Sequence, residues 1–188
     1  MVNADGKKKT GINDLEEEMK SEPLEIERKY LVKIPDMETI KKQKDYKIAE
    51  MTQMYLDDNG QYAGIRIRKS LCSGKISCKK TIKRDITPLK RIEIESDITL
   101  QEYEALSKHC DPGYKPIHKW RHSFSYKNQT IELDIYDFWK DRATVEVEMA
   151  SESQEVELPD FIEVIKEVTE DRRYRNRSLA KKVICEEV

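Results

Sequence analysis

The stretch EPLEIERKYLVKIP, residues 22–35, alternates charged and apolar side chains. Successive side chains of a β-strand point to opposite faces of its sheet, so Glu25, Glu27 and Lys29 would lie together on one face. The apolar side chains between them would lie on the other face. The stretch therefore predicts a strand with one apolar face and one ionic face, and the ionic face carries two carboxylates beside an ammonium.

The same alternation returns along the rest of the chain, and turn residues separate the alternating segments. A period of two residues is typical of strands. We expect strands at residues 24–33, 51–57, 63–69, 75–83, 90–97, 119–126, 130–136 and 143–150. Short helices are expected from Asp36 to Lys44, behind a capping box of Thr99 and Glu102, and in SLAKKVICEE near the C-terminus.

The length of 188 residues suits one ordinary domain. Residues 1–22 are rich in charge and poor in large apolar side chains, so we expect a disordered tail there and a single folded domain over residues 23–188. The N-terminus has no apolar signal-peptide core, and no apolar run reaches the roughly 20 residues that a membrane helix needs. We therefore expect a cytoplasmic protein without a membrane partner.

The composition excludes several classes of protein. Charged residues make up 38% of the chain, yet the net charge is only -2, so the basic excess of a general nucleic-acid binder is absent and no nucleic-acid partner is expected. The four cysteines have no zinc-ligand spacing and are expected to be free thiols, with a Cys72–Cys78 disulfide as the alternative. The chain also lacks a GxxxxGK motif, which excludes a P-loop nucleotidase.

The ionic faces of the expected strands are sorted by charge. Some strands carry basic side chains on this face, namely Arg66 and Arg68, Lys79 and Lys83, and Lys119 and Arg121. Other strands carry mainly acidic side chains there, namely Glu93 and Glu95 beside Arg91, Glu132 and Asp134, and Glu146 and Glu148. Alternation alone usually means an antiparallel sheet with one face in water, and that interpretation stays open. A solvated face, however, gives no reason to sort charge by strand. A closed antiparallel barrel of about eight strands, with the ionic faces lining its interior and the apolar faces packed outward under helices, does give one.

Like charges so close together repel one another in a low-dielectric interior unless counter-ions are present. A divalent cation on the carboxylates and a polyanion on the Lys and Arg rows would neutralise both sets. Carboxylate oxygens suit Mg²⁺ or Mn²⁺, and fixed cations suit phosphoryl oxygens. The pattern thus indicates a site for a metal-bound polyphosphate.

The motifs also carry a resemblance. EIERKYLV resembles the ExExK signature that opens the CYTH superfamily, the triphosphate tunnel metalloenzymes, and RIR, TIK, RIEIE, TIELDIY, VEVEM and EVTEDRRYRNRSLA follow in that family's order. The match runs from about residue 22 to about residue 182 and is most similar to the short bacterial branch, whose members hydrolyse inorganic tripolyphosphate. The resemblance implies a mainly β, α+β fold: a closed antiparallel eight-stranded barrel, or triphosphate tunnel, with a few flanking helices.

The resemblance also implies roles for residues at matching positions. The metal ligands for Mg²⁺ or Mn²⁺ would be Glu25, Glu27 and Glu148, with Glu146 as a helper. The catalytic set would consist of Lys29 together with Glu25, Glu27 and Glu148. The bases that would hold phosphate are Lys29, Arg66, Arg68, Lys83, Lys119 and Arg121. A looser assignment to the lumen covers Lys79, Arg91, Glu93, Glu95, Glu132 and Asp134, and Arg84 and Lys90 are candidates for the tunnel mouth.

Other side chains have simpler interpretations. His118 and His122 would point away from Lys119 and Arg121, so packing on the outer face is expected in place of metal binding. In the motif near the C-terminus, Arg173, Tyr174 and Asn176 are expected to close one end of the tunnel and not to contact substrate.

The activity that the resemblance implies is metal-dependent hydrolysis of the terminal phosphate of a triphosphate, with inorganic tripolyphosphate as the expected substrate and pyrophosphate and phosphate as products. Lys29 would steady the transferring phosphoryl group, because neighbouring carboxylates should keep it protonated. A class IV adenylate cyclase, a nucleoside or thiamine triphosphatase, and a non-catalytic polyphosphate-binding module remain alternatives. The sequence leaves the oligomeric state open, with a homodimer among the options.

Overall fold

The computed structural model describes residues 24–57, 65–87 and 90–185, and all of their side chains except those of residues 24, 83–85, 90 and 91. The expected tail, residues 1–22, therefore lies outside the described residues, as does the start of the strand expected at residue 63. The elements, in chain order, are β1 (Leu24–Lys33), α2 (Met37–Lys41), β2 (Lys47–Tyr55), β3 (Arg66–Cys72), β4 (Lys75–Asp85), β5 (Lys90–Ile98), α3 (Leu100–Ser107), β6 (Ile117–Tyr126), β7 (Gln129–Tyr136), β8 (Arg142–Glu148), β9 (Val164–Glu167), the 3₁₀ turn η1 (Arg172–Tyr174) and α4 (Asn176–Lys181).

The strands form one antiparallel sheet of nine strands in the order β5-β4-β3-β2-β6-β7-β8-β1-β9. In two hairpins the strands are joined by a tight turn whose two residues have left-handed backbone. The turn residues are Ser73 and Gly74 between β3 and β4, and Lys127 and Asn128 between β6 and β7. Two-residue turns of this kind match the twist of antiparallel strands and fix their register. The expected mainly β fold with few helices is confirmed.

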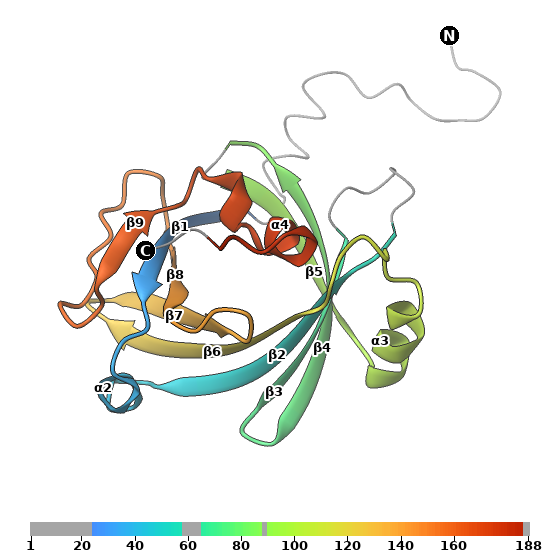
Figure 1. Ribbon diagram of the computed structural model, residues 1–188, viewed down its shortest axis with the longest axis horizontal. Coiled ribbons are helices and arrows are strands. Elements are labelled where there is room, and N and C mark those ends of the chain that lie inside the picture. Colours follow the sequence, from blue (N-terminus) through green and yellow to red (C-terminus); the bar gives the residue numbers. More distant parts are fainter. Residues whose placement is uncertain (1–23, 58–64, 88–89, 186–188) are drawn as a thin grey trace, which may run out of the picture.

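The sheet bends round until β5 lies beside β1 (Figure 1). This additional pairing joins Leu24–Ile26 of β1 to residues 90–92 of β5. It stops there, because residues 30–32 of β1 pair with β9, while β8 occupies the opposite edge of β1. The expectation of a closed eight-stranded barrel was therefore wrong in two respects: the sheet has nine strands, and β5 does not pair with β1 along its full length.

The helix signals in the sequence are confirmed at their N-termini. The Asp36 carboxylate accepts hydrogen bonds from the backbone of Glu38 and Thr39 at the start of α2. Thr99 and Glu102 form the expected capping box at the start of α3. No helix within the described residues is long and apolar enough to cross a membrane.

The apolar side chains on the outer face of the sheet form two clusters. The larger one covers β1, β6, β7 and β8 and contains Val32, Ile40, Phe124, Ile131, Leu133, Ala143, Val145, Val147 and Ile162. The smaller one lies against α3 and contains Leu56, Ile67, Cys78 and Tyr103. Helices cover only part of this face, and Ile48 and Trp120 on β2 and β6 remain exposed. The expectation that helices cover the whole outer face was thus too broad.

Candidate functional site

The opposite face of the sheet, called the inner face below, carries the ionic side chains. Register sets their neighbours: Lys29 of β1 lies opposite Glu146 of β8, and Glu146 lies opposite Glu132 of β7. Arg121 of β6 lies opposite Asp134 of β7. Strand alternation then places the following predicted residues on this one face: Glu25, Glu27, Lys29, Arg66, Arg68, Lys79, Glu93, Glu95, Lys119, Arg121, Glu132, Asp134, Glu146 and Glu148.

Five of these side chains form a continuous ionic chain, called the central cluster, made of Lys29, Lys119, Arg121, Asp134 and Glu146. The Arg121 guanidinium donates to both oxygens of Asp134, through Nε and Nη2 at 2.7 Å each, and Nη2 also donates to Glu146 at 2.6 Å. Lys29 Nζ lies 2.9 Å from the other oxygen of Glu146, and Lys119 donates to Asp134. Each carboxylate thus contacts two cations, which compensates charges that would be costly to bury alone.

The ionisation of the central cluster follows from these contacts. Burial alone would raise the pKa of Glu146 and of Asp134, but the cations beside each carboxylate hold its pKa below the usual value. Burial would lower the pKa of Lys29, yet Glu146 outweighs it and raises that pKa. Lys119 behaves differently, because burial and the adjacent Arg121 lower its pKa to about 8 in spite of Asp134. Asp134 is shared between two cations and is pulled mainly by Arg121, so Lys119 is the less strongly held partner.

A second group, the β3–β5 cluster, consists of Arg66, Arg68, Lys79, Thr81 and Glu95. Arg68 Nη2 donates to Glu95 at 3.1 Å, Lys79 Nζ lies 2.5 Å from the other oxygen of Glu95, and Arg66 Nη2 donates to Thr81 at 3.1 Å. Burial opposes ionisation of Glu95, but the surrounding bases lower its pKa. The Nε groups of Arg66 and Arg68 are buried and have no acceptor among the residues that the structure describes. Such donors are suited to an anionic ligand.

The predicted metal ligands fall into two groups. Glu27 lies directly opposite Glu148 in the β1–β8 ladder, and Glu25 is one position further along the same face of β1. Glu146, the expected helper, is instead taken up by Lys29 and Arg121. Within the described ranges, no three His, Cys, Asp or Glu side chains converge on a common point. The assignment of these acids to a metal therefore stays a prediction.

Several predicted bases can be placed by register alone. Lys83 lies opposite Glu93, Arg91 lies opposite Glu25, and Lys90 lies opposite Ile26. Their side chains and that of Arg84 are outside the described set, so their contacts stay predictions.

One end of the inner face is apolar and is called the floor. On four strands the inward-facing residue next to an ionic or polar side chain is apolar or aromatic. These floor residues are Leu31 after Lys29 on β1, Tyr55 after Gln53 on β2, Ile117 before Lys119 on β6 and Tyr136 after Asp134 on β7. They pack with side chains of the C-terminal segment and its neighbours, namely Trp139, Val168, Tyr174, Leu179 and Ala180. In Figure 1 this segment, with α4, lies across the space that the sheet curves around.

The residues of the C-terminal motif, the histidines and the cysteines lie outside the two ionic clusters. Tyr174 is buried in the floor, and Asn176 accepts a hydrogen bond of 2.8 Å from Tyr136, which fits a structural role. Arg173 instead pairs with Asp171 at the surface. His122 is buried on the outer face beside Tyr46, and His118 is exposed beside Thr52. The four cysteines are free thiols.

Sequence reasoning assigned no role to three inner-face residues, Gln53, Tyr55 and Thr81. Gln53 and Thr81 are both fully buried, and Tyr55 is 5% exposed. The signal was available in MTQMYL, where Gln53 interrupts an otherwise apolar inward row on β2. The short strand β9 was also missed, because four residues give too little alternation to recognise.

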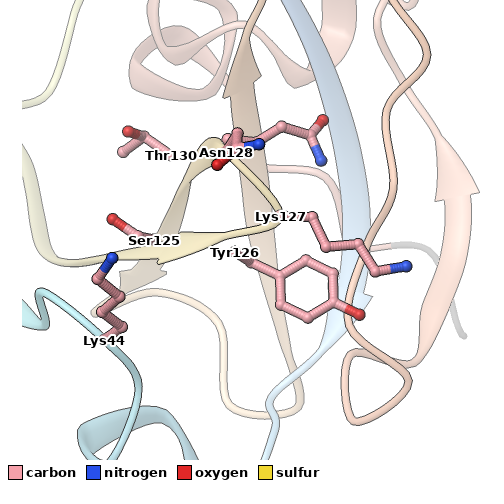
Figure 2. A pocket seen from close by; sticks show the side chains of 7 residues that line it. Lys44, Ser125, Tyr126, Lys127, Asn128 and Thr130 are labelled. Carbon is pink, nitrogen blue, oxygen red and sulfur yellow. The ribbon is translucent and has the colours of Figure 1, made fainter.

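A pocket of about 300 Å³ lies away from these clusters, at the turn between β6 and β7. Figure 2 shows Lys44 and Ser125 on one side of this hairpin and Lys127 and Tyr126 on the other. Its lining has surface lysines but none of the predicted site residues.

The buried ion pairs predict how the protein responds to acid. Asp134→Asn would leave Lys119 and Arg121 buried with less compensating charge, so we expect the free energy of unfolding at pH 7 to fall by roughly 3–5 kcal/mol. The pKa of Asp134 is lowered on folding, so its stabilising effect is present above about pH 4 and is lost as the pH falls below that value. The variant should therefore lose less stability between pH 7 and pH 3 than the wild type does. Urea unfolding at both pH values measures this.

The matched control is Asp171→Asn, which removes the partly exposed pair with Arg173 and should cost less than about 1 kcal/mol. Equal losses from the two substitutions would contradict the picture of a charge-compensated interior.

Several solved protein structures are similar to this chain in sequence and fold. A solved structure described as the inorganic triphosphatase NE1496 is 28% identical over 84% of this chain and 94% of that chain, with a TM-score of 0.51. A second structure of NE1496, described as a hypothetical protein, is 28% identical over 85% of this chain and 99% of that chain, with a TM-score of 0.53. The protein PH1819 from Pyrococcus horikoshii OT3 shares the fold at 19% identity, over 69% of this chain and 80% of that one, with a TM-score of 0.52. No curated protein matches the chain. The CYTH domain family model matches residues 23–183, nearly the whole chain. The chain therefore belongs to the CYTH domain family.

Proposed function

We propose that this chain is a divalent-metal-dependent triphosphatase that hydrolyses the terminal phosphate of inorganic tripolyphosphate to give pyrophosphate and phosphate. The observation that carries the proposal is the inner face, where buried bases from β1, β3 and β6 are gathered beside carboxylates from β1, β5, β7 and β8. The similarity to NE1496, which is described as an inorganic triphosphatase, supports it.

The basic side chains would grip the polyphosphate chain. Phosphoryl transfer needs little covalent chemistry from a protein and much fixed positive charge. A largely buried face supplies that charge through Lys29, Arg66, Arg68, Lys119 and Arg121. The Nε donors of Arg66 and Arg68 have no acceptor among the described residues and can bind phosphate oxygens. Lys79, Lys83 and Arg91 would extend the grip.

The carboxylates would divide into two roles. We assign Glu93, Glu95, Glu132, Asp134 and Glu146 to orienting the bases, as their ion pairs with Arg66, Arg68 and Arg121 indicate. Lys29 would contact the transferring phosphate as an ammonium and not as a base, because Glu146 raises its pKa.

Glu25, Glu27 and Glu148 would hold the cation. Like charges directly opposite one another in a ladder destabilise it, so the facing pair Glu27 and Glu148 favours a bound counter-ion. Mg²⁺ is usually held by one or two carboxylates together with substrate phosphates, so a facing pair suffices and these oxygen donors fit it. Mg²⁺ or Mn²⁺ bound there would supply charge neutralisation for the phosphoryl oxygens.

The triphosphate would lie on the inner face, which the sheet curves around, with the floor at one end. Substrate would then enter from the end where Glu25 and Ser123 lie, opposite the floor. The inner-face aromatics Tyr55 and Tyr136 are packed in the floor, so neither offers a free surface on which a nucleoside base can stack.

Substrate preference follows from this lining. Binding energy would come from phosphate contacts, so kcat/KM for tripolyphosphate should exceed that for ATP by at least about tenfold, or roughly 1.4 kcal/mol of transition-state stabilisation. Pyrophosphate should be a poor substrate, since it is too short to reach both the metal and the far bases. Orthophosphate release from tripolyphosphate, ATP, thiamine triphosphate and pyrophosphate, each with Mg²⁺ and with Mn²⁺, measures this. ATP turnover equal to that of tripolyphosphate, or release of cyclic AMP, would overturn the substrate assignment.

The metal assignment has its own test. Glu27→Gln keeps the size of the side chain but removes an anionic ligand, so turnover should fall by about a hundredfold or more while the melting temperature is preserved. Excess EDTA should abolish wild-type activity. The control is Glu50→Gln, because Glu50 is exposed on the outer face of β2 and its loss should leave turnover unchanged. Undiminished activity of Glu27→Gln would remove these acids from the metal site.

A further inference from the structure

Gln53 is a polar side chain that the proposed chemistry does not yet use. It lies two residues before the end of β2, is fully buried, and faces inward. Its cross-strand neighbours are Arg68 on β3 and Ile117 on β6, so it stands between the bases of the β3–β5 cluster and the floor. A buried amide needs hydrogen-bond partners, and those partners indicate what it does.

The amide of Gln53 contacts one base and one floor residue. Its Nε2 donates to the Tyr55 hydroxyl at 2.6 Å, and its Oε1 accepts from Arg66 Nη1 at 3.5 Å. The opposite orientation of the amide would place an NH₂ group against a guanidinium, which has no acceptor. The contact with Arg66 therefore fixes which way the amide points.

The fixed amide has a consequence on each side. Tyr55 Oη accepts from Gln53, so its own proton is not committed to this contact. The long contact of Arg66 Nη1 limits the rotation of the guanidinium, while Nη2 donates to Thr81 at 3.1 Å and to Glu93 at 3.2 Å. The buried Nε of Arg66 has no acceptor among the described residues. Gln53 of β2, Thr81 of β4 and Glu93 of β5 together hold this guanidinium.

The floor reinforces the arrangement from behind. The Arg177 guanidinium of α4 lies over the Tyr55 ring, 5.8 Å from its centroid, and donates from Nε to the Tyr114 hydroxyl at 3.2 Å. Tyr55 is thus clamped between the C-terminal segment and Gln53. Movement of the Gln53 amide would be transmitted to Arg66 on one side and to Tyr55 on the other.

We propose that Gln53 is a positioning residue that sets the orientation of the Arg66 guanidinium, and of the Tyr55 hydroxyl beside it, toward a bound triphosphate. It does not touch the substrate itself. The inference rests on the proposed function, because it takes the ligand of Arg66 to be a polyphosphate.

A purely structural role for Gln53 makes different predictions. If the amide only satisfied buried hydrogen bonds, its replacement would change stability and leave substrate binding alone. Replacing a buried polar group by an apolar one of similar shape can be nearly neutral for stability. Gln53→Met keeps the length of the side chain and removes both hydrogen bonds, so the two roles can be separated.

The test measures KM and kcat for tripolyphosphate, the melting temperature, and metal-free binding of tripolyphosphate by calorimetry. Gln53→Met should raise KM and the calorimetric Kd about tenfold, with kcat within about threefold of wild type and a melting temperature within a few degrees. Gln53→Glu should weaken binding more, because a carboxylate would pair with Arg66 and repel phosphate.

The control is Gln129→Met at the other buried glutamine in the described chain, which faces outward and donates to the Glu157 carbonyl at 3.1 Å. It should leave KM and Kd unchanged.

The outcomes separate the two claims. Wild-type protein that binds tripolyphosphate without hydrolysing it would contradict the proposed function, yet the Kd values would still test Gln53. If Gln53→Met and Gln53→Glu both bind tripolyphosphate within twofold of wild type, the positioning role is wrong. A lower melting temperature with unchanged KM would show that the amide serves the fold alone. Wild-type protein that neither binds nor hydrolyses tripolyphosphate would overturn both claims.

Discussion

The structure depends on one constraint: every charge on the inner face of the sheet has to meet an opposite charge or a ligand. Strand alternation turns the ionic side chains at alternate positions of β1 to β8 toward this face, where Lys29, Lys119 and Asp134 are buried. Antiparallel register then decides the partners, placing Lys29 opposite Glu146 and Arg121 opposite Asp134. The cations and carboxylates of the central cluster pair with one another, whereas the Nε donors of Arg66 and Arg68 have no acceptor among the described residues. The proposed activity follows from this division.

The C-terminal segment gives the inner face a direction. Its side chains pack on Leu31, Tyr55 and Tyr136, so the rows of charge end on an apolar floor. The hydrogen bond from Tyr136 to Asn176 and the contact of Arg177 with Tyr55 tie this segment to β7 and β2. A substrate bound on the inner face would therefore meet a rigid surface at one end, which suits a short inorganic chain.

Period-two alternation was enough to predict the eight longer strands and to sort their side chains onto two faces, because burial imposes that period directly. It could not predict the ends of the sheet. The edge of β1 is shared between β5 and β9, and this sharing depends on a strand of four residues without a sequence signal. The alternation could not predict side-chain partners either. By position Glu146 matches a metal helper, but in the structure it lies between Lys29 and Arg121. The contacts of Gln53 depend on the pairing of β2 with β3 and β6, which the alternation does not specify.

The central claim is that buried cations on the inner face bind a triphosphate chain. Arg68 tests it best, because its loss leaves Glu95 paired with Lys79 and near Arg66, so the fold should survive. Tripolyphosphate titrated by calorimetry into metal-free wild type should bind with one site per chain, and Arg68→Gln should raise Kd by about tenfold or more, while Arg173→Gln at the surface leaves it unchanged. Equal Kd values for Arg68→Gln and wild type would contradict the claim.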